Sequence, residues 1–338
     1  MDILNGVIRR NETNINAAGG TELMTERLLN MLTEEHKRDF QFIISRLRHP
    51  LDETKKRVLI LHDLPNDSES NIIARHYHER FHKIVFVSHW QQQAFINHYR
   101  LPWSKTAVLK NAIEPIDISD SPFELRSGDS GVCRIIYHTT PHRGLKLLVP
   151  VVDELSKTYN VHLDVYSSFG VYGWGDRDEH FKDLFDYISN HEHMTYHGAV
   201  PNDEVREALK KSHIFAYPSI WPETSCISLM EAMSAGCVCI HPDFAALPET
   251  AANLTVQYTW QEDEEKHRDM LYRTLASVIR TMHDGNKSLA GMLHYQKSYA
   301  DLFYSLEYRK TEWNSFLSSI EVEDTSLPKT DGYFIYGT

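Results

Sequence analysis

The amino-acid sequence predicts an α/β protein of two domains, each a parallel sheet with helices on both faces. Short apolar, β-branched runs alternate along the chain with longer patterns of helical period, as they do in doubly wound folds. The length of 338 residues suggests two domains, at roughly 150 residues each. Residues 114–131, rich in Pro, Ser, Gly and Asp, interrupt the alternation and are the expected linker.

The strand candidates are short apolar runs bounded by polar or turn residues. In chain order they are Asp2 to Ile8, Phe40 to Ile44, Arg57 to Leu61, Lys83 to Val87, Cys133 to Tyr137, Val161 to Tyr166, His213 to Tyr217 and Cys237 to Ile240. Between the first two, residues 21–32 form an amphipathic helical pattern, whose apolar stripe consists of Leu23, Met24, Leu28, Leu29 and Leu32.

After Asp243 the strand signals fade, and two long helical patterns follow. One lies around Met270 to Met282, and the other runs from Leu293 to Leu317. The second holds a dense aromatic set, which predicts a helix packed into the core. Its members are Tyr295, Tyr299, Phe303, Tyr304, Tyr308, Trp313 and Phe316.

Composition excludes several classes of protein. The chain has 35 Lys and Arg against 47 Asp and Glu, a net charge of −12, and lacks the basic face that nucleic-acid binding needs. No apolar run approaches the roughly 20 residues of a membrane span, and Met1 to Arg10 lacks a signal-peptide core, so we expect a soluble, cytoplasmic protein. The four cysteines, at 133, 226, 237 and 239, are too few for a disulfide scaffold and wrongly spaced for zinc, so we expect buried thiols.

The most informative segment runs from His213 to Thr250. After its strand, a proline-rich loop delivers Glu223, and a helix is expected from about Thr224 to Ala235. Glu231 follows Glu223 by eight residues, about 12 Å along a helix, which is close to the length of an extended nucleoside-diphosphate sugar. The helix start offers unpaired backbone N–H groups to a diphosphate, at Thr224, Ser225, Cys226 and Ile227.

Spacing alone leaves two interpretations of the acidic pair open. Glu231 lies among apolar residues, where an ionised carboxylate needs hydrogen-bond donors such as ribose hydroxyls. Alternatively, Glu223 caps the helix and Glu231 forms a salt bridge.

This segment resembles the donor-binding signature of the GT-B retaining glycosyltransferases of family 4. In that family the second of two glutamates at this spacing begins the motif Glu-Ala-Met-Ser-Ala-Gly, here residues 231–236. A Pro-Glu-Thr, here residues 248–250, follows further along the chain. The resemblance implies two Rossmann-like, doubly wound domains facing a central cleft. It places an acceptor domain at residues 1–128, joined by a C-terminal helix at about 295–338 that crosses back to it, and a donor domain at 132–294.

Further segments resemble the family in the same order. Ala17 to Glu22 matches its glycine loop, which implies that Gly19 and Gly20 lie under the diphosphate, and His62 falls at its active-site histidine position. Two shorter segments, Val87 to His89 and Lys110 to Ile113, resemble the elements with which the family's first domain ends.

In the second domain, residues 137–145 resemble the loop that carries basic diphosphate contacts. The sequence departs from the commoner pattern, since Arg143 with Gly144 fills the second basic place and no Arg fills the first. Arg143 is therefore the expected phosphate clamp, with Lys146 a weaker candidate.

Two loops complete the predicted site. Residues 197–201 resemble the loop against the nucleotide base, with contacts expected at Gly198 and Val200. Asp176 to Asp178 is interpreted as a solvated loop rather than a metal motif, so no metal or other cofactor is expected.

The resemblance implies transfer of a hexose, with retention, from a nucleotide-sugar donor to a glycan or other hydroxyl acceptor. Glu223 would hold the sugar, Glu231 the ribose and Arg143 the phosphates, with His62 near the sugar. GDP-mannose is favoured only because it is common in the family, and a monomer or homodimer is expected.

Other functions stay open at this point. One alternative is a nucleotide-sugar epimerase of the same fold, and another is a catalytically silent protein that binds sugar nucleotides. A Rossmann dehydrogenase is disfavoured, because no G-x-G-x-x-G follows a strand.

Overall fold

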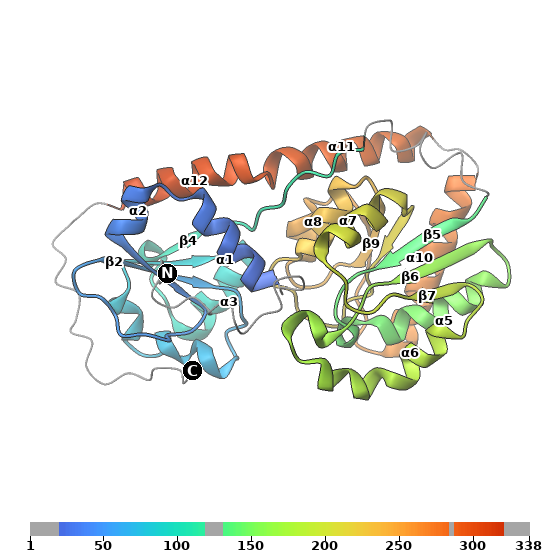
Figure 1. The fold of residues 1–338 in the computed structure, drawn as a ribbon, viewed down its shortest axis with the longest axis horizontal. Helices are drawn as coiled ribbons and strands as arrows, with labels where there is room; N and C mark the ends of the chain where they lie inside the picture. Colours follow the sequence, from blue (N-terminus) through green and yellow to red (C-terminus); the bar gives the residue numbers. More distant parts are fainter. Residues whose placement is uncertain (1–19, 119–130, 284–286, 321–338) are drawn as a thin grey trace. The chain divides into compact units, whose positions relative to one another are not determined.

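The computed structural model describes residues 20–118, 131–283 and 287–320. The chain divides into two compact units (Figure 1). The described part of the first unit comprises residues 20–112 and 304–320, and the second unit spans Ile113–Phe303. Of the expected linker, residues 119–130 lie outside the described residues, as do the predicted strand at residues 2–8 and the predicted glycine contact at Gly19.

The first unit contains a four-stranded parallel sheet in the order β1-β2-β3-β4. The strands are β1 (Phe40–Ile44), β2 (Lys56–Leu61), β3 (Lys83–Phe86) and β4 (Thr106–Val108). Its helices are α1 (Gly20–Met31), α2 (Glu34–Asp39), α3 (His89–Tyr99) and α12 (Leu306–Ser319), with 3₁₀ turns at Ser68–Ile73, Tyr77–Arg80 and Trp103–Lys105.

Apolar side chains fill both faces of this sheet. On one face, Phe42 and Ile60 pack in a cluster with Leu28 of α1 and Trp313 of α12. On the other, Ile43 and Leu59 join a cluster that includes Phe95 of α3. Burial on both faces explains why β1 is nearly all apolar rather than alternating, with the buried Gln41 as its single polar residue.

The second unit contains a six-stranded parallel sheet in the order β10-β9-β8-β5-β6-β7. The strands are β5 (Cys133–Tyr137), β6 (Val161–Val165), β7 (Met194–Tyr196), β8 (Ile214–Ala216), β9 (Val238–Pro242) and β10 (Val256–Tyr258). The order runs outward from β5 to β7 and then returns to β8 on the other side of β5. The topology therefore has a switch point between β5 and β8.

Helices and 3₁₀ turns lie between these strands, and two helices, α10 and α11, follow the last strand (Figure 1). The helices are α5 (Leu145–Ser156), α6 (Lys182–Ser189), α7 (Asn202–Lys211), α8 (Ile227–Ser234), α9 (Leu247–Ala251), α10 (Glu264–His283) and α11 (Lys287–Phe303). The 3₁₀ turns are Pro141–Arg143, Phe169–Tyr172 and Gly175–Phe181. None of the helices in the described ranges is both long enough and apolar enough to cross a bilayer.

Two predictions about the last third of the chain were wrong. A strand, β10, does follow Asp243, and it pairs with β9 through three residues that are too few to show a pattern. The single helix predicted over residues 293–317 is two helices, because Ser305 interrupts the pattern and caps α12, its Oγ accepting a hydrogen bond from Tyr308 N at 3.2 Å.

The aromatic set of that region is also less buried than expected. Tyr304 and Trp313 lie in the core, whereas Tyr295 is 69% exposed and Tyr308 41% exposed. The split helix presents its residues on two different stripes, so one periodic pattern could not place them all. By contrast, all four cysteines are buried thiols, as predicted.

Candidate active site

Two loops meet at the switch point of the second sheet. The loop after β5 carries Arg143, and the loop after β8 carries Glu223. Their backbones are joined directly, since Ile220 N donates to Arg143 O at 3.1 Å. In open α/β sheets, ligands bind at this position because two neighbouring loops diverge there.

Gly144 allows this close approach. Residues that carry a side chain rarely adopt its φ of +135°. In addition, a Cβ at this position would lie 2.1 Å from Pro218 O. The Arg143-Gly144 pair therefore places the arginine directly against the second loop.

We expect Gly144→Ala to lower the free energy of unfolding by about 2 kcal/mol or more, from backbone strain and steric overlap. Denaturant unfolding measures the change. Gly175→Ala is the matched control, because a Cβ at Gly175 would meet nothing within 4 Å, and it should change stability little. Equal stabilities of the two variants would contradict the close approach.

Glu223 is the buried acid of the site, with an exposed fraction of 4%. Its Oε1 accepts hydrogen bonds from Arg143 Nη1, at 2.5 Å, and from Tyr217 Oη. Burial, reinforced by the carboxylate charge, raises the pKa of Tyr217, so its hydroxyl stays protonated and donates. Among the described residues, none donates to Oε2, which leaves that oxygen as the acceptor for a ligand hydroxyl.

Arg143 stays charged in this setting. Burial lowers the pKa of its guanidinium, but the Glu223 carboxylate outweighs that effect and the net shift is upward. Its Nε is buried with no hydrogen-bond partner among the described residues. A buried unpaired donor costs free energy until water or a ligand satisfies it.

The same loop holds further buried polar atoms of this kind. Besides Arg143 Nε they are His138 Nε2, Thr139 Oγ1, Thr140 Oγ1 and His142 Nδ1, all without a hydrogen-bond partner among the described residues. Burial lowers the pKa of His142 to about 4 and that of His138 to about 3, so both imidazoles are neutral near pH 7. This concentration of unsatisfied groups within residues 138–143 makes the loop the candidate lining of a polar-ligand site.

The second acid, Glu231, has protein partners of its own. It lies on α8 with an exposed fraction of 2%. Its Oε2 accepts from Asn202 Nδ2 at 3.2 Å, and its Oε1 pairs with Arg206 Nη1 at 3.4 Å, both from α7. The salt bridge that the spacing left open is therefore present, and a ribose would share or displace these donors.

The helix between the acids begins later than predicted. It starts at Ile227, and Cys226 before it has extended backbone with no side-chain cap. The predicted 12 Å rise from Glu223 to Glu231 is wrong, because residues 223–226 are not helical. The half-buried residues Thr224 and Ser225 thus belong to the loop, while Ile227 contributes to the uncapped start of α8.

Lys146 does not join this group. Its Nζ forms an ion pair with Glu264 of α10, and its side chain is 48% exposed. Lys146 is therefore part of a surface ion pair in the structure. No contact with Arg143 or Glu223 is seen for it, and the phosphate contact predicted for Lys146 stays a prediction.

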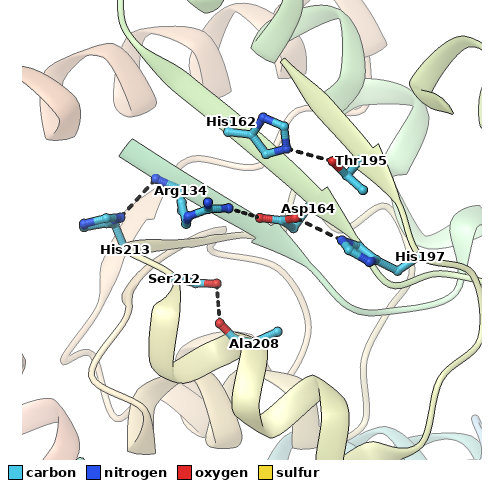
Figure 2. Close-up of polar contacts among 8 residues, drawn as sticks. All are labelled: Arg134, His162, Asp164, Thr195, His197, Ala208, Ser212 and His213. Atoms are coloured by element: carbon cyan, nitrogen blue, oxygen red, sulfur yellow. Dashed lines mark hydrogen bonds and ion pairs between the residues drawn. The ribbon is translucent and has the colours of Figure 1, made fainter. Parts of the chain in front are cut away.

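The predicted base loop follows β7. Gly198 has a φ of +70°, and Val200 is half-buried. Figure 2 shows how the loop is anchored, with His197 Nε2 2.9 Å from Asp164 Oδ1 and Asp164 Oδ2 paired with Arg134 at 3.2 Å. His197 also stacks on Tyr166, with ring centroids 4.1 Å apart.

The Asp176 to Asp178 segment is more ordered than the predicted solvated loop. Asp178 accepts hydrogen bonds from Ser168 Oγ and from Phe169 N, the latter at 2.8 Å, and so holds a 3₁₀ turn. Within the described ranges, no three His, Cys, Asp or Glu side chains are grouped to hold a metal ion.

The predicted residues of the first unit lie in a separate group. His62 follows β2, and burial lowers its pKa to about 4, so it is neutral near pH 7. It lines a small cavity of about 30 Å³ together with Thr25, Lys110, Asn111, Arg309 and Trp313. Gly20 is the first residue of α1.

Sequence reasoning missed Tyr217 and Arg206 as partners of the two acids. In the sequence, Tyr217 was recognised only as the last residue of a predicted strand. A buried tyrosine hydroxyl needs a hydrogen-bond partner, so this residue could have been predicted to bond to a nearby polar group. Arg206 lies on the amphipathic helix α7 among other charged residues, and nothing in the sequence distinguishes it there from a solvent-exposed cation.

Tyr217→Phe should reduce kcat/KM by about 10-fold, because it removes a hydrogen bond to a charged carboxylate while Arg143 still holds Oε1. The KM for the donor should rise, whereas the affinity for the free nucleotide should stay unchanged. Tyr258→Phe is the matched control, since it removes a buried hydrogen bond to His267 in the same unit. Equal activity losses in both variants would show a merely structural effect.

Comparisons with known proteins relate this chain to glycosyltransferases. Residues 124–270 match the family model Glycosyl transferases group 1. The chain is 25% identical over 166 residues to one of the polypeptides of human phosphatidylinositol N-acetylglucosaminyltransferase, an alignment that covers 49% of this chain and 33% of that protein. The alignment thus spans about a third of that relative's length.

Solved structures share the fold along nearly the whole chain. A glycosyltransferase from Rickettsia africae has a TM-score of 0.64 at 15% identity and covers 91% of this chain and 84% of its own. Anabaena Alr3699/HepE in complex with UDP-glucose has a TM-score of 0.61 at 17% identity, covering 88% and 82%. The chain therefore contains a glycosyl transferases group 1 domain at residues 124–270, and its two parallel sheets have the GT-B glycosyltransferase fold.

Proposed function

We propose that this protein transfers a hexose from a nucleotide-sugar donor to an acceptor hydroxyl. The observation that supports it best is Glu223, a buried carboxylate at the switch point. Two donors hold its Oε1, and no described residue donates to its Oε2. A fixed acceptor beside a buried guanidinium suits a ligand that carries hydroxyls and phosphates together.

The donor we propose is a UDP-linked hexose of the glucose or N-acetylglucosamine type. Support comes from the name of the human relative and from the UDP-glucose bound to the Anabaena protein. The expectation of GDP-mannose depended on family frequency and on no residue of this chain, and neither of these relatives favours it.

Negative charge on the departing diphosphate would be stabilised by Arg143, by the unpaired groups of residues 138–140 and by the uncapped start of α8. Glu223 would bind a sugar hydroxyl through Oε2. Glu231 would bind the ribose, with Asn202 and Arg206 orienting its carboxylate. His62 and Gly20 of the first unit remain candidates for contacts to the sugar and the diphosphate.

We propose retention by front-side displacement without a metal. The leaving phosphate would help to deprotonate the acceptor, and Glu223 would bind a sugar hydroxyl through Oε2 rather than attack the anomeric carbon, so no covalent intermediate would form. Mass-spectrometric capture of a glycosyl-enzyme adduct would overturn this route.

Incubation of the pure protein with UDP-N-acetylglucosamine, UDP-glucose or GDP-mannose, with and without a panel of glycan acceptors, tests the function. Acceptor-dependent release of UDP supports it. An epimerised sugar nucleotide formed from donor alone would indicate an epimerase instead, and calorimetric binding without any turnover would indicate a silent binding protein.

A further inference from the structure

Trp221 is an exposed indole on a fixed loop. Its exposed fraction is 40%, and it lies two residues before Glu223. The buried side chain of Ser219 fixes the backbone, because its Oγ donates to Trp221 O at 2.8 Å and accepts from Trp221 N at 3.2 Å. An indole held rigidly in contact with water is positioned to stack on a ligand without losing side-chain freedom on binding.

The indole touches two residues of the neighbouring loop. Its ring lies edge-on to His142, with centroids 5.1 Å apart and planes at 80°, and the Arg143 guanidinium lies 6.0 Å from its centroid. His142 in turn stacks on Phe169, with centroids 5.1 Å apart. The indole therefore has packed neighbours on one side and remains exposed elsewhere.

Both residues that Trp221 touches have a buried polar atom with no hydrogen-bond partner among the described residues. These atoms are Arg143 Nε and His142 Nδ1. An apolar surface bordered by unsatisfied polar groups is the environment of a ligand that has an apolar face and polar edges.

A pyranose has that shape, since its C–H groups form a face and its hydroxyls surround the ring. We propose that Trp221 is the stacking surface for the hexose of the donor, with His142 Nδ1 as a partner for one of its hydroxyls. This inference rests on the proposed function and extends it by naming a residue that determines sugar affinity. Uracil could also stack on an indole, so the test separates the sugar from the nucleotide.

The experiment measures calorimetric affinities of the full chain for UDP-N-acetylglucosamine, UDP-glucose and UDP alone. We expect Trp221→Ala to weaken binding of the UDP-sugars by about fivefold to tenfold and to leave the affinity for UDP unchanged, while Trp221→Tyr keeps most of the sugar affinity. His142→Ala should also weaken only the sugar nucleotides. Trp103→Ala, which removes an indole that is 58% exposed in the first unit, is the control and should change neither affinity.

Thermal unfolding of each variant shows whether it is folded. Trp221→Leu, which keeps apolar bulk but has no aromatic face, is the second variant should Trp221→Ala unfold, and it too should bind the UDP-sugars more weakly than wild type with UDP unaffected. Equal losses for UDP and UDP-sugars would assign the indole to the base and overturn the inference, as would wild-type affinities in Trp221→Ala. Absence of any sugar-nucleotide binding by the wild type would refute the proposed function as well.

Discussion

Glu223→Gln should reduce kcat/KM for sugar transfer by about 100-fold or more while the protein remains folded. A neutral amide keeps the size of the side chain but loses the charge that strengthens a hydrogen bond to a sugar hydroxyl. One charged hydrogen bond contributes about 1.5–3 kcal/mol, and the amide also leaves the Arg143 guanidinium unpaired at the site of charge development.

Steady-state kinetics with the donor that the wild type prefers gives the comparison, and circular dichroism reports the fold. Glu207→Gln is the matched control, because Glu207 is 63% exposed and pairs with Lys210 one turn along α7. That variant should keep full activity. Undiminished transfer by Glu223→Gln would remove this residue from the site.

Arg143→Met should weaken donor binding and also destabilise the second unit. The methionine leaves a carboxylate that is 4% exposed without its cation, and breaking a buried pair from one side costs about 3 kcal/mol. The phosphates of the donor lose a charged donor as well, worth about 1.5–3 kcal/mol of binding. We therefore expect an affinity for UDP at least about 10-fold weaker.

Calorimetry with UDP and denaturant unfolding measure these two effects separately. Arg273→Met is the matched control, since Arg273 is 73% exposed and pairs with Asp269 on the surface of α10. Such a pair contributes about 0–1 kcal/mol, so the control should change stability little and UDP affinity not at all. Unchanged UDP affinity in Arg143→Met would show that the arginine serves Glu223 alone.

Much of the fold is visible in the sequence because parallel strands buried on both faces are continuous apolar runs. The observed β1 and β5 coincide with the predicted runs. The strands that escaped prediction, β4, β7 and β10, have three residues each and are only partly buried, whereas β8, equally short, is fully buried and lies in an apolar run. Their pairing with longer neighbours, rather than their own residues, makes them strands.

The site was predicted in part. Glu223 and Arg143 were both named from sequence, but their direct contact was not, and Glu231 was assigned to a ligand before its contact with Arg206 was known. Tyr217 and Trp221 lie in the same segment as Glu223. Tyr217 depends on a partner 6 residues away, and Trp221 on partners 78 and 79 residues away along the chain, which no local pattern specifies.

The sequence by itself determined the alternation of strands and helices, the acidic pair around α8 and the Arg143-Gly144 turn, because each is a local pattern of residue type and spacing. Only the tertiary structure decided which groups these residues meet. Strand order places β8 beside β5, and that adjacency brings Glu223 to Arg143 across 80 residues of chain. Because a charge removed from water must be paired, burial makes each carboxylate depend on its partner for stability.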